Sequence, residues 1–276
     1  MPSDKQNPLN PFSTLLKEHG NDAESIRELY AHHRDRNQEK NKAALLSSGD
    51  IVVDRILADV VKRGDDADSR NSVTVWERPS EEVKALAREV QKHLGQIEPS
   101  IWLMPEQCMH MTSMEWFYSV DNVTIHRLVN KIPKTVARSL SAGPKAPVLL
   151  DTPMLSFFEN AIAITFLPSL STHDGYTYLH YRRDLLNQAA AVEDPELAIH
   201  MRYALPSAHI TIARFTEPLS SKNKGRAWVD VLEMLNREVV RPRTDVVWTL
   251  DGPAILRAGT VWYGGGFTVK GSQRLD

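Results

Sequence analysis

The sequence predicts a mixed α and β fold, of the α+β (α/β) type, built as two related lobes and preceded by a helical extension. Residues 1–70 place apolar side chains at helical spacing, whereas residues 71–276 alternate strand-like and helix-like segments. The second half of this alternation repeats the order of the first, with an offset of 99 residues from position 110 to position 209. A repeat of this size favours two lobes over a solenoid, whose repeats are about 20 to 50 residues long.

The individual elements follow from periodicity and from turn residues. After a charged turn at 63–71, we expect strands at 73–76, 101–104, 107–118, 147–158, 160–167, 209–215, 245–257 and 260–270. Helices are expected from residue 79, over 121–139 and over 225–240. The segment 176–191, which joins the two halves, is expected to begin as a loop or short strand and to continue as a helix. The predicted domains are a helical extension, 1–70, and a two-lobed domain, 71–276.

Composition excludes several classes of protein. The 276 residues are 42% hydrophobic and 25% charged, and the net charge of −2 lacks the positive excess of a protein that coats duplex nucleic acid. The single cysteine, Cys108, cannot form an internal disulfide or a cysteine-based zinc site, which favours an intracellular protein without metal or cofactor. No apolar stretch has the length of a signal peptide or of a membrane span, so we expect a soluble, cytoplasmic or nuclear monomer that does not contact membranes.

Two segments carry the same short motif. CMHMTSMEW contains His110 and Thr112, and AHITIARF contains His209 and Thr211. In a strand, residues two apart point to the same face, so each motif presents an imidazole beside a hydroxyl group. An imidazole can accept or donate a proton near neutral pH, and a hydroxyl group can donate to a phosphate oxygen. Two such strands across a groove would place a base and an acid on opposite sides of a phosphorus atom, as in-line displacement requires.

A structural role is the alternative for these histidines, because a strand histidine is usually half-buried and hydrogen-bonded in the core. One His-x-Ser/Thr match is also expected by chance in a chain with 10 histidines. The context favours function: both motifs lie in apolar strands, and their separation equals the apparent repeat.

The paired His110-Met111-Thr112 and His209-Ile210-Thr211 resemble the signature of the 2H phosphoesterases, over about residues 72–271. This resemblance implies two pseudo-symmetric lobes, each an antiparallel sheet flanked by helices, around a central cleft. It also implies metal-independent hydrolysis of 2′,3′-cyclic phosphates, related cyclic phosphodiesters or RNA ends.

Carried onto this chain, the resemblance makes His110 and His209 the general acid and base, with their assignment open, and makes Thr112 and Thr211 the ligands of the phosphate oxygens. Two neighbouring positions depart from a simple match. Met114 puts an apolar side chain on the active face, and Arg214 would need a β-bulge to reach the phosphate.

Further substrate contacts are expected from aromatic and basic residues. Tyr263 is a candidate for stacking on a base, and Tyr178, Tyr181 and Arg182 could line the entrance; a packing role is the alternative for each. The basic loop 220–226 could steer a phosphate or be a solvated turn, and the glycines at 264–266 are expected to give the backbone room.

Three functions are compatible with these patterns. The first is a metal-independent phosphodiesterase that acts on a nucleotide or on an RNA 3′-end with a cyclic phosphate. The second is a module that binds such an end in the same cleft without turnover. The third is a scaffold whose N-terminal helices recruit a partner.

Overall fold

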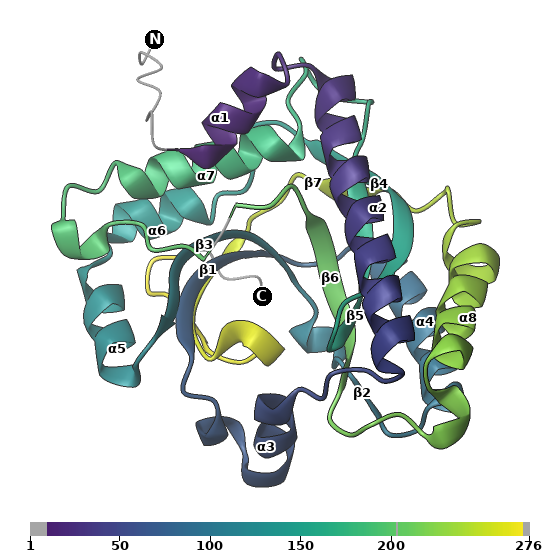
Figure 1. The fold of residues 1–276 in the computed structure, drawn as a ribbon. Coiled ribbons are helices and arrows are strands. Elements are labelled where there is room, and N and C mark those ends of the chain that lie inside the picture. The colour runs from purple at the N-terminus through teal and green to yellow at the C-terminus, as the bar shows by residue number, and fades with distance from the viewer. Residues whose placement is uncertain (1–9, 203, 273–276) are drawn as a thin grey trace.

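Two antiparallel sheets form the frame of the protein in the computed structural model, which describes residues 10–202 and 204–272 (Figure 1). The strands are β1 Asn71–Glu77, β2 Ile101–Leu103, β3 Met111–Val120, β4 Val148–Phe157, β5 Ala161–Pro168, β6 Ala208–Phe215, β7 Trp248–Leu250, β8 Ile255–Gly259 and β9 Phe267–Thr268. One sheet has the order β3-β1-β8-β9 and the other has the order β2-β6-β5-β4-β7. The predicted α+β class is therefore confirmed. The first nine residues of the expected extension and residues 273–276 lie outside the described residues.

Helices pack around both sheets. They are α1 Pro11–Glu18, α2 Ala23–Ser48, α3 Arg55–Arg63, α4 Glu81–Ile97, α5 Asn122–Lys131, α6 Lys134–Leu140, α7 Tyr178–Ala190 and α8 Arg226–Leu235. Helices α5 and α6 contact the four-stranded sheet, α4 and α8 contact the five-stranded sheet, and α7 contacts a strand of each. Among the described residues, no helix combines the length and the apolar character needed to cross a membrane.

The two lobes are interleaved in the chain rather than formed by one half each. The chain passes from β1 in the four-stranded sheet to β2 in the other sheet, returns for β3, and then contributes β4 to β7 before β8 and β9 return. The repeat along the sequence therefore does not divide the chain into one lobe per half. The predicted strand 245–257 is in fact two strands, because Asp251, Gly252 and Pro253 form a turn that carries the chain from one sheet to the other.

Three other predicted elements differ in their bounds. The helix expected over 121–139 is divided into α5 and α6 at Pro133, which lacks the N–H that a helix interior needs. The strand expected from residue 107 begins at Met111, so His110 precedes it. The strand expected over 260–270 is limited to β9, because a short 3₁₀ helix and a glycine turn come first.

The N-terminal helices share the core of the sheets. Phe12, Ile26 and Tyr30 are buried in the same hydrophobic cluster as the side chains of both sheets. Helix α2 lies against β5, β4 and α8, and Figure 1 shows it running alongside β5 and β4 of the five-stranded sheet. This position brings one face of α2 close to the strand that carries the second His-x-Thr motif.

Candidate active site

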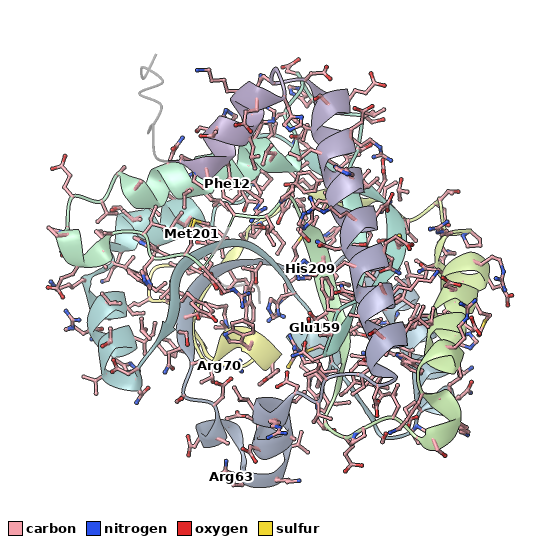
Figure 2. The ribbon with its side chains drawn as sticks, viewed as in Figure 1. Phe12, Arg63, Arg70, Glu159, Met201 and His209 are labelled. Carbon is pink, nitrogen blue, oxygen red and sulfur yellow. The ribbon has the colours of Figure 1, made fainter. Side chains whose placement is uncertain are left out.

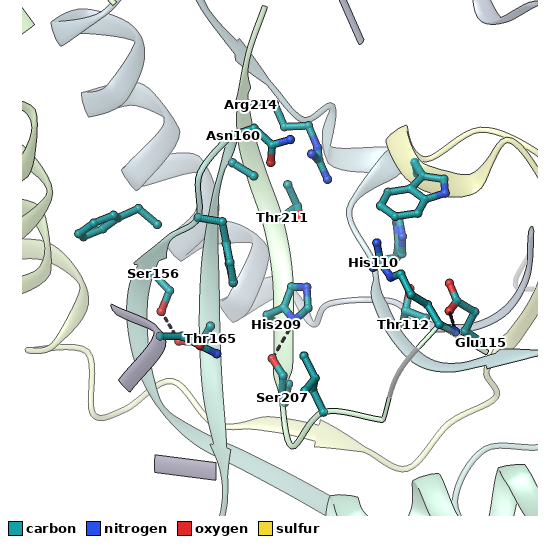
Figure 3. A pocket seen from close by; sticks show the side chains of 18 of the residues that line it. His110, Thr112, Glu115, Ser156, Asn160, Thr165, Ser207, His209, Thr211 and Arg214 are labelled. Carbon is teal, nitrogen blue, oxygen red and sulfur yellow. Dashed lines mark hydrogen bonds between the residues drawn. The ribbon is translucent and has the colours of Figure 1, made fainter. Parts of the chain in front are cut away.

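Both His-x-Thr motifs line a single cavity of about 730 Å³ between the two sheets. His110 comes directly before β3 and Thr112 lies at the start of that strand in one sheet, whereas His209 and Thr211 lie on β6 in the other sheet. Figure 3 shows the two imidazoles on facing walls of this cavity. The structure thus brings together the four residues that the sequence singled out.

His110 is held in one orientation and one tautomer. Its Nδ1 lies 2.8 Å from the carbonyl oxygen of Cys108, which can only accept, so Nδ1 carries the proton and Nε2 keeps its lone pair. The ring stacks on Trp76 with centroids 3.7 Å apart and planes 14° apart. Burial lowers the pKa of His110 to about 3, and the charge of Arg78 contributes to the decrease. The imidazole is therefore neutral at neutral pH.

His209 has a less restricted environment. It lies within β6 opposite Thr165 of β5, and its Nδ1 is 3.0 Å from the hydroxyl oxygen of Ser207. The ring of Phe158 lies 5.8 Å away at an angle of 46°. Burial lowers the pKa of His209 to about 4, and the nearby charge of Arg182 has the next largest effect. This imidazole is also neutral at neutral pH.

Each motif is followed by a β-bulge at the same position. The pairing of β1 with β3 steps over Ser113, and the pairing of β5 with β6 steps over Ile212, so each extra residue lies three positions after the motif histidine. A bulge shifts which residues share a face. The residue five positions after each histidine, Glu115 in one lobe and Arg214 in the other, consequently lines the cavity. The bulge that Arg214 would need to face the phosphate is present.

A buried network holds Arg214 beside the second motif. Its Nη1 donates to Asp54 Oδ2 at 3.0 Å, and the hydroxyl group of Tyr263 donates to Asp54 Oδ1 at 2.8 Å. Arg70 in turn donates to the Tyr263 oxygen at 2.9 Å and forms an ion pair with Asp68. The buried Nε of Arg214 has no hydrogen-bond partner among the described residues. Arg214 is thus oriented by its carboxylate partner and retains a donor for a ligand.

The lining of the cavity is positively charged. Among the described residues that line the cavity, the arginines are Arg34, Arg55, Arg70, Arg182, Arg202 and Arg214, and the acidic residues are Asp54 and Glu115. Six positive charges against two negative ones leave an excess of four, in a chain whose net charge is −2. Such a lining attracts anions.

One face of α2 forms a wall of the cavity that the sequence analysis missed. Its lining residues are Tyr30, His33, Arg34, Asn37, Gln38 and Asn41, at spacings typical of a single helix face. Asn41 anchors the helix by donating from Nδ2 to the carbonyl oxygen of Phe157, at 2.9 Å, at the end of β4. A solvent-exposed helix also has a polar face at helical spacing, so periodicity alone does not distinguish a face that lines a cavity from one that faces solvent.

The structure places the other candidate residues away from the cavity or at its edge. Tyr178 and Tyr181 are buried in the core, where Tyr178 donates to Ser113 Oγ at 3.3 Å and Tyr181 donates to Glu77 Oε1 at 2.5 Å. Neither lines the cavity, whereas Arg182 of the same helix, α7, does. Tyr263 lies behind the lining in the Asp54 network described above, and its neighbour Trp262 lines the cavity instead.

Of two further segments that the sequence singled out, the glycines at 264–266 have the expected role and the basic loop 220–226 does not line the cavity. A Cβ atom at Gly264 would lie 2.2 Å from the Cβ atom of Cys108, two residues before His110, so this glycine does give the backbone room. The loop lies outside the lining, and its Lys224 forms an ion pair with Asp50 at 2.6 Å. In the described part of the chain, no three His, Cys, Asp or Glu side chains are grouped closely enough to hold a metal ion.

Comparisons with known proteins add little to this geometry. No family model matches the sequence, and no curated protein matches it. Among solved structures, the crystal structure of TT0787 of Thermus thermophilus is similar at 14% identity and a TM-score of 0.36, over 73% of this chain and 100% of that chain. The proposal of a function therefore depends on the site itself.

Proposed function

We propose that the chain is a metal-independent phosphodiesterase that opens a 2′,3′-cyclic phosphate or hydrolyses a related phosphodiester at a nucleotide or RNA end. One observation carries the proposal: two His-x-Thr motifs from different sheets line the same positively charged cavity. A phosphodiester is an anion whose cleavage needs a base on one side of phosphorus and an acid on the other. The facing imidazoles supply this pair.

The reaction is an in-line displacement. One imidazole takes a proton from a water molecule, whose oxygen forms a new bond to phosphorus while the bond to the departing ribose oxygen breaks. The second imidazole gives that ribose oxygen a proton, so one proton is taken up and one is released. The hydroxyl groups of Thr112 and Thr211 and the free Nε of Arg214 donate to the nonbridging oxygens, where negative charge accumulates.

The low pKa values of His110 and His209 suit the role of general base, because a base must be neutral before the reaction. The acid must carry a proton, yet burial in the protein alone keeps both imidazoles neutral. An anionic phosphate beside an imidazole favours the charged form and raises its pKa. Substrate binding is therefore expected to take up a proton, and the rate should be highest on the acidic side of neutrality.

The same observation favours a second function, which is binding of a nucleotide or RNA end without turnover. If a bound phosphate left both imidazoles neutral, the cavity would hold the ligand but would lack an acid. Following both the binding and the chemical fate of a labelled 2′,3′-cyclic nucleotide separates the two functions. Binding without product would favour the module.

The decisive experiment compares turnover by the wild-type protein, His110→Ala and His209→Ala, with EDTA present. The substrates are 2′,3′-cyclic nucleotides, ADP-ribose cyclic phosphate, 2′,5′-linked oligonucleotides and 3′-oligouridine RNA. Loss of either imidazole should lower the rate on the preferred substrate by about 10² to 10⁴-fold. His32→Ala is the matched control, because His32 is a histidine of α2 outside the cavity. Full activity in both cavity variants, or loss of all activity with EDTA, would refute the proposal.

A further inference from the structure

Arg182 is a buried cation without a carboxylate partner. Its exposed fraction is 8%, and it lines the cavity from α7. Its guanidinium group donates from Nε to the carbonyl oxygen of Ser113 at 3.0 Å and from Nη1 to the carbonyl oxygen of Leu205, and it lies 4.2 Å above the ring of Phe12. Among residues 10–202 and 204–272, no carboxylate forms an ion pair with it. Buried arginines are normally paired, so this charge requires an explanation.

The excess positive charge of the cavity is not spread evenly, because the arginines near Arg214 have carboxylate partners. There, Arg214 is paired with Asp54 and Arg70 is paired with Asp68. The positive charge of those residues is therefore largely balanced before any ligand binds. The Arg182 side has no such balance. In Figure 2 the labelled Phe12, on which Arg182 stacks, lies higher in the view than His209, and Arg70 lies lower.

Two further donors from α2 lie near Arg182. The hydroxyl group of Tyr30, with an exposed fraction of 1%, lines the cavity and has no acceptor for its proton among the described residues. His33 also lines the cavity, and the Nδ2 of Asn37 donates to its Nε2 at 2.8 Å, which leaves Nδ1 as an N–H donor. Tyr30 and His33 lie about one turn apart on α2, and the ring of Tyr178 lies 6.3 Å from the ring of Tyr30 and 5.7 Å from the guanidinium group of Arg182. All three donors line the same cavity.

This group of donors lies next to the second motif. Arg182 donates to the carbonyl oxygen of Leu205, two residues before Ser207, and the hydroxyl group of Ser207 lies 3.0 Å from Nδ1 of His209. A ligand whose reacting phosphate lies between His110 and His209 would therefore have a second group within reach of these donors. An anionic group would balance the charge of Arg182, which has no carboxylate partner among the described residues, and would accept the proton of the Tyr30 hydroxyl group.

We propose that Arg182, Tyr30 and His33 form a second anion subsite, which binds a phosphate group of the substrate other than the one that reacts. This inference rests on the proposed function and specifies its substrate class: a nucleotide cyclic phosphodiester that carries a second phosphate. A 5′-phosphorylated nucleoside 2′,3′-cyclic phosphate meets this description, and so does an RNA end whose last internucleotide phosphate reaches the subsite. A nucleoside 2′,3′-cyclic phosphate without a second phosphate leaves the subsite unfilled.

Binding tests the subsite without any need for turnover. Titration calorimetry would compare adenosine 3′,5′-bisphosphate with adenosine 3′-monophosphate. The wild-type protein should bind the bisphosphate about tenfold or more tightly, because a hydrogen bond to a charged group is worth about 1.5 to 3 kcal/mol. Arg182→Gln, Tyr30→Phe and His33→Gln should each lower this ratio. His32→Gln, a change to the neighbouring histidine on the same helix, should leave it unchanged because His32 does not line the cavity.

Turnover provides the second arm. The ratio of kcat/KM for adenosine 2′,3′-cyclic phosphate with and without a 5′-phosphate should favour the phosphorylated form by a similar factor in the wild type. A dinucleotide with a terminal cyclic phosphate and no 5′-phosphate tests the RNA end separately, because its only other phosphate is internucleotide. Loss of the preference in Tyr30→Phe and His33→Gln supports the subsite.

The outcomes separate this inference from the proposed function. Arg182 also donates to the carbonyl oxygen of the bulge residue Ser113, so Arg182→Gln could disturb folding. If that variant does not fold, Tyr30→Phe and His33→Gln test the subsite. Equal affinity of the wild type for the bisphosphate and the monophosphate, or an unchanged ratio in both Tyr30→Phe and His33→Gln, would overturn the subsite. A retained bisphosphate preference without turnover of any substrate would support the subsite and refute the phosphodiesterase.

Discussion

The two His-x-Thr motifs share their spacing but differ in how the protein holds each imidazole. His110 is stacked flat on Trp76 and bonded to a backbone carbonyl oxygen, so both its orientation and its tautomer are determined. His209 is bonded to the hydroxyl group of Ser207, which can donate or accept, and its aromatic neighbour is tilted. The difference indicates that a repeated motif need not imply repeated roles. We expect His110, whose Nε2 keeps its lone pair, to be the base and His209 to be the acid.

The residue five positions after each histidine extends the comparison. Equivalent bulges turn Glu115 and Arg214 into the cavity, so the same backbone device presents a carboxylate in one lobe and a guanidinium group in the other. Glu115 Oε2 accepts from the backbone N–H of Arg202 at 2.9 Å, whereas Arg214 keeps a buried donor that has no partner among the described residues. Only the second lobe has a cation at this position to stabilise a phosphate.

Charge-removing variants at these two positions should give the largest contrast. Arg214→Gln should lower kcat/KM by about 10² to 10³-fold, because it removes a charged donor to the oxygens of the transition state. Glu115→Gln should lower it by less than about tenfold, because no developing positive charge faces this carboxylate. Steady-state kinetics on the preferred cyclic phosphate measures both, and Arg214→Lys controls for charge. A larger loss in Glu115→Gln would reverse the roles assigned to the two lobes.

The sequence predicted what is local and missed what depends on distant partners. The paired motifs and the start of α4 at Ser80, whose side chain accepts from the Val83 N–H, are visible within a few residues. The bulge at Ile212 is defined by pairing with β5, and the lining role of α2 depends on its packing against the five-stranded sheet. Interleaved lobes were missed because the turn that contains Pro253 carries the chain to another sheet, which no local pattern indicates.

The acid sensitivity of folding tests whether both imidazoles are held neutral. Their pKa values in the folded protein are about 3 for His110 and about 4 for His209, below the value of about 6.5 expected in the unfolded chain. Below pH 6.5 the unfolded chain therefore binds protons that the folded protein does not bind, and stability falls as the pH falls. Each imidazole should cost on the order of 1 to 2 kcal/mol between pH 7 and pH 5.

Urea unfolding at these two pH values measures that cost. His110→Gln and His209→Gln should each lose less stability than the wild type over the interval. Burial raises the pKa of Glu77 to about 8, which acts in the opposite direction, but it does so equally in every variant and cancels in the comparison. If a histidine variant showed the wild-type pH dependence, that imidazole would not be held neutral by the fold.

Removal of the aromatic neighbours should give a smaller contrast. Trp76→Leu leaves the His110 ring without the surface on which it stacks, and we expect kcat to fall about tenfold because the base is then less well oriented. Phe158→Leu, beside the tilted ring of His209, should change kcat by about threefold or less. Because Trp76 is fully buried, circular dichroism must first show that the variant is folded at the assay temperature. Equal effects on kcat would mean that stacking does not orient the base.

The smallest expected effect concerns the hydrogen-bond partner of the acid. Ser207→Ala removes the only hydrogen bond to His209 Nδ1 among the described residues, and a lost bond of about 1 kcal/mol corresponds to a fall in kcat of about fivefold. Nitrogen NMR of the imidazoles would show a single Nδ1–H tautomer for His110 and a mixture for His209. Ser207→Thr retains a hydroxyl group and should retain both the activity and the mixture. A single, unchanged tautomer of His209 in the wild type and in Ser207→Ala would show that the hydroxyl group does not distinguish the acid from the base, and the assignment would then depend on the charges around each ring.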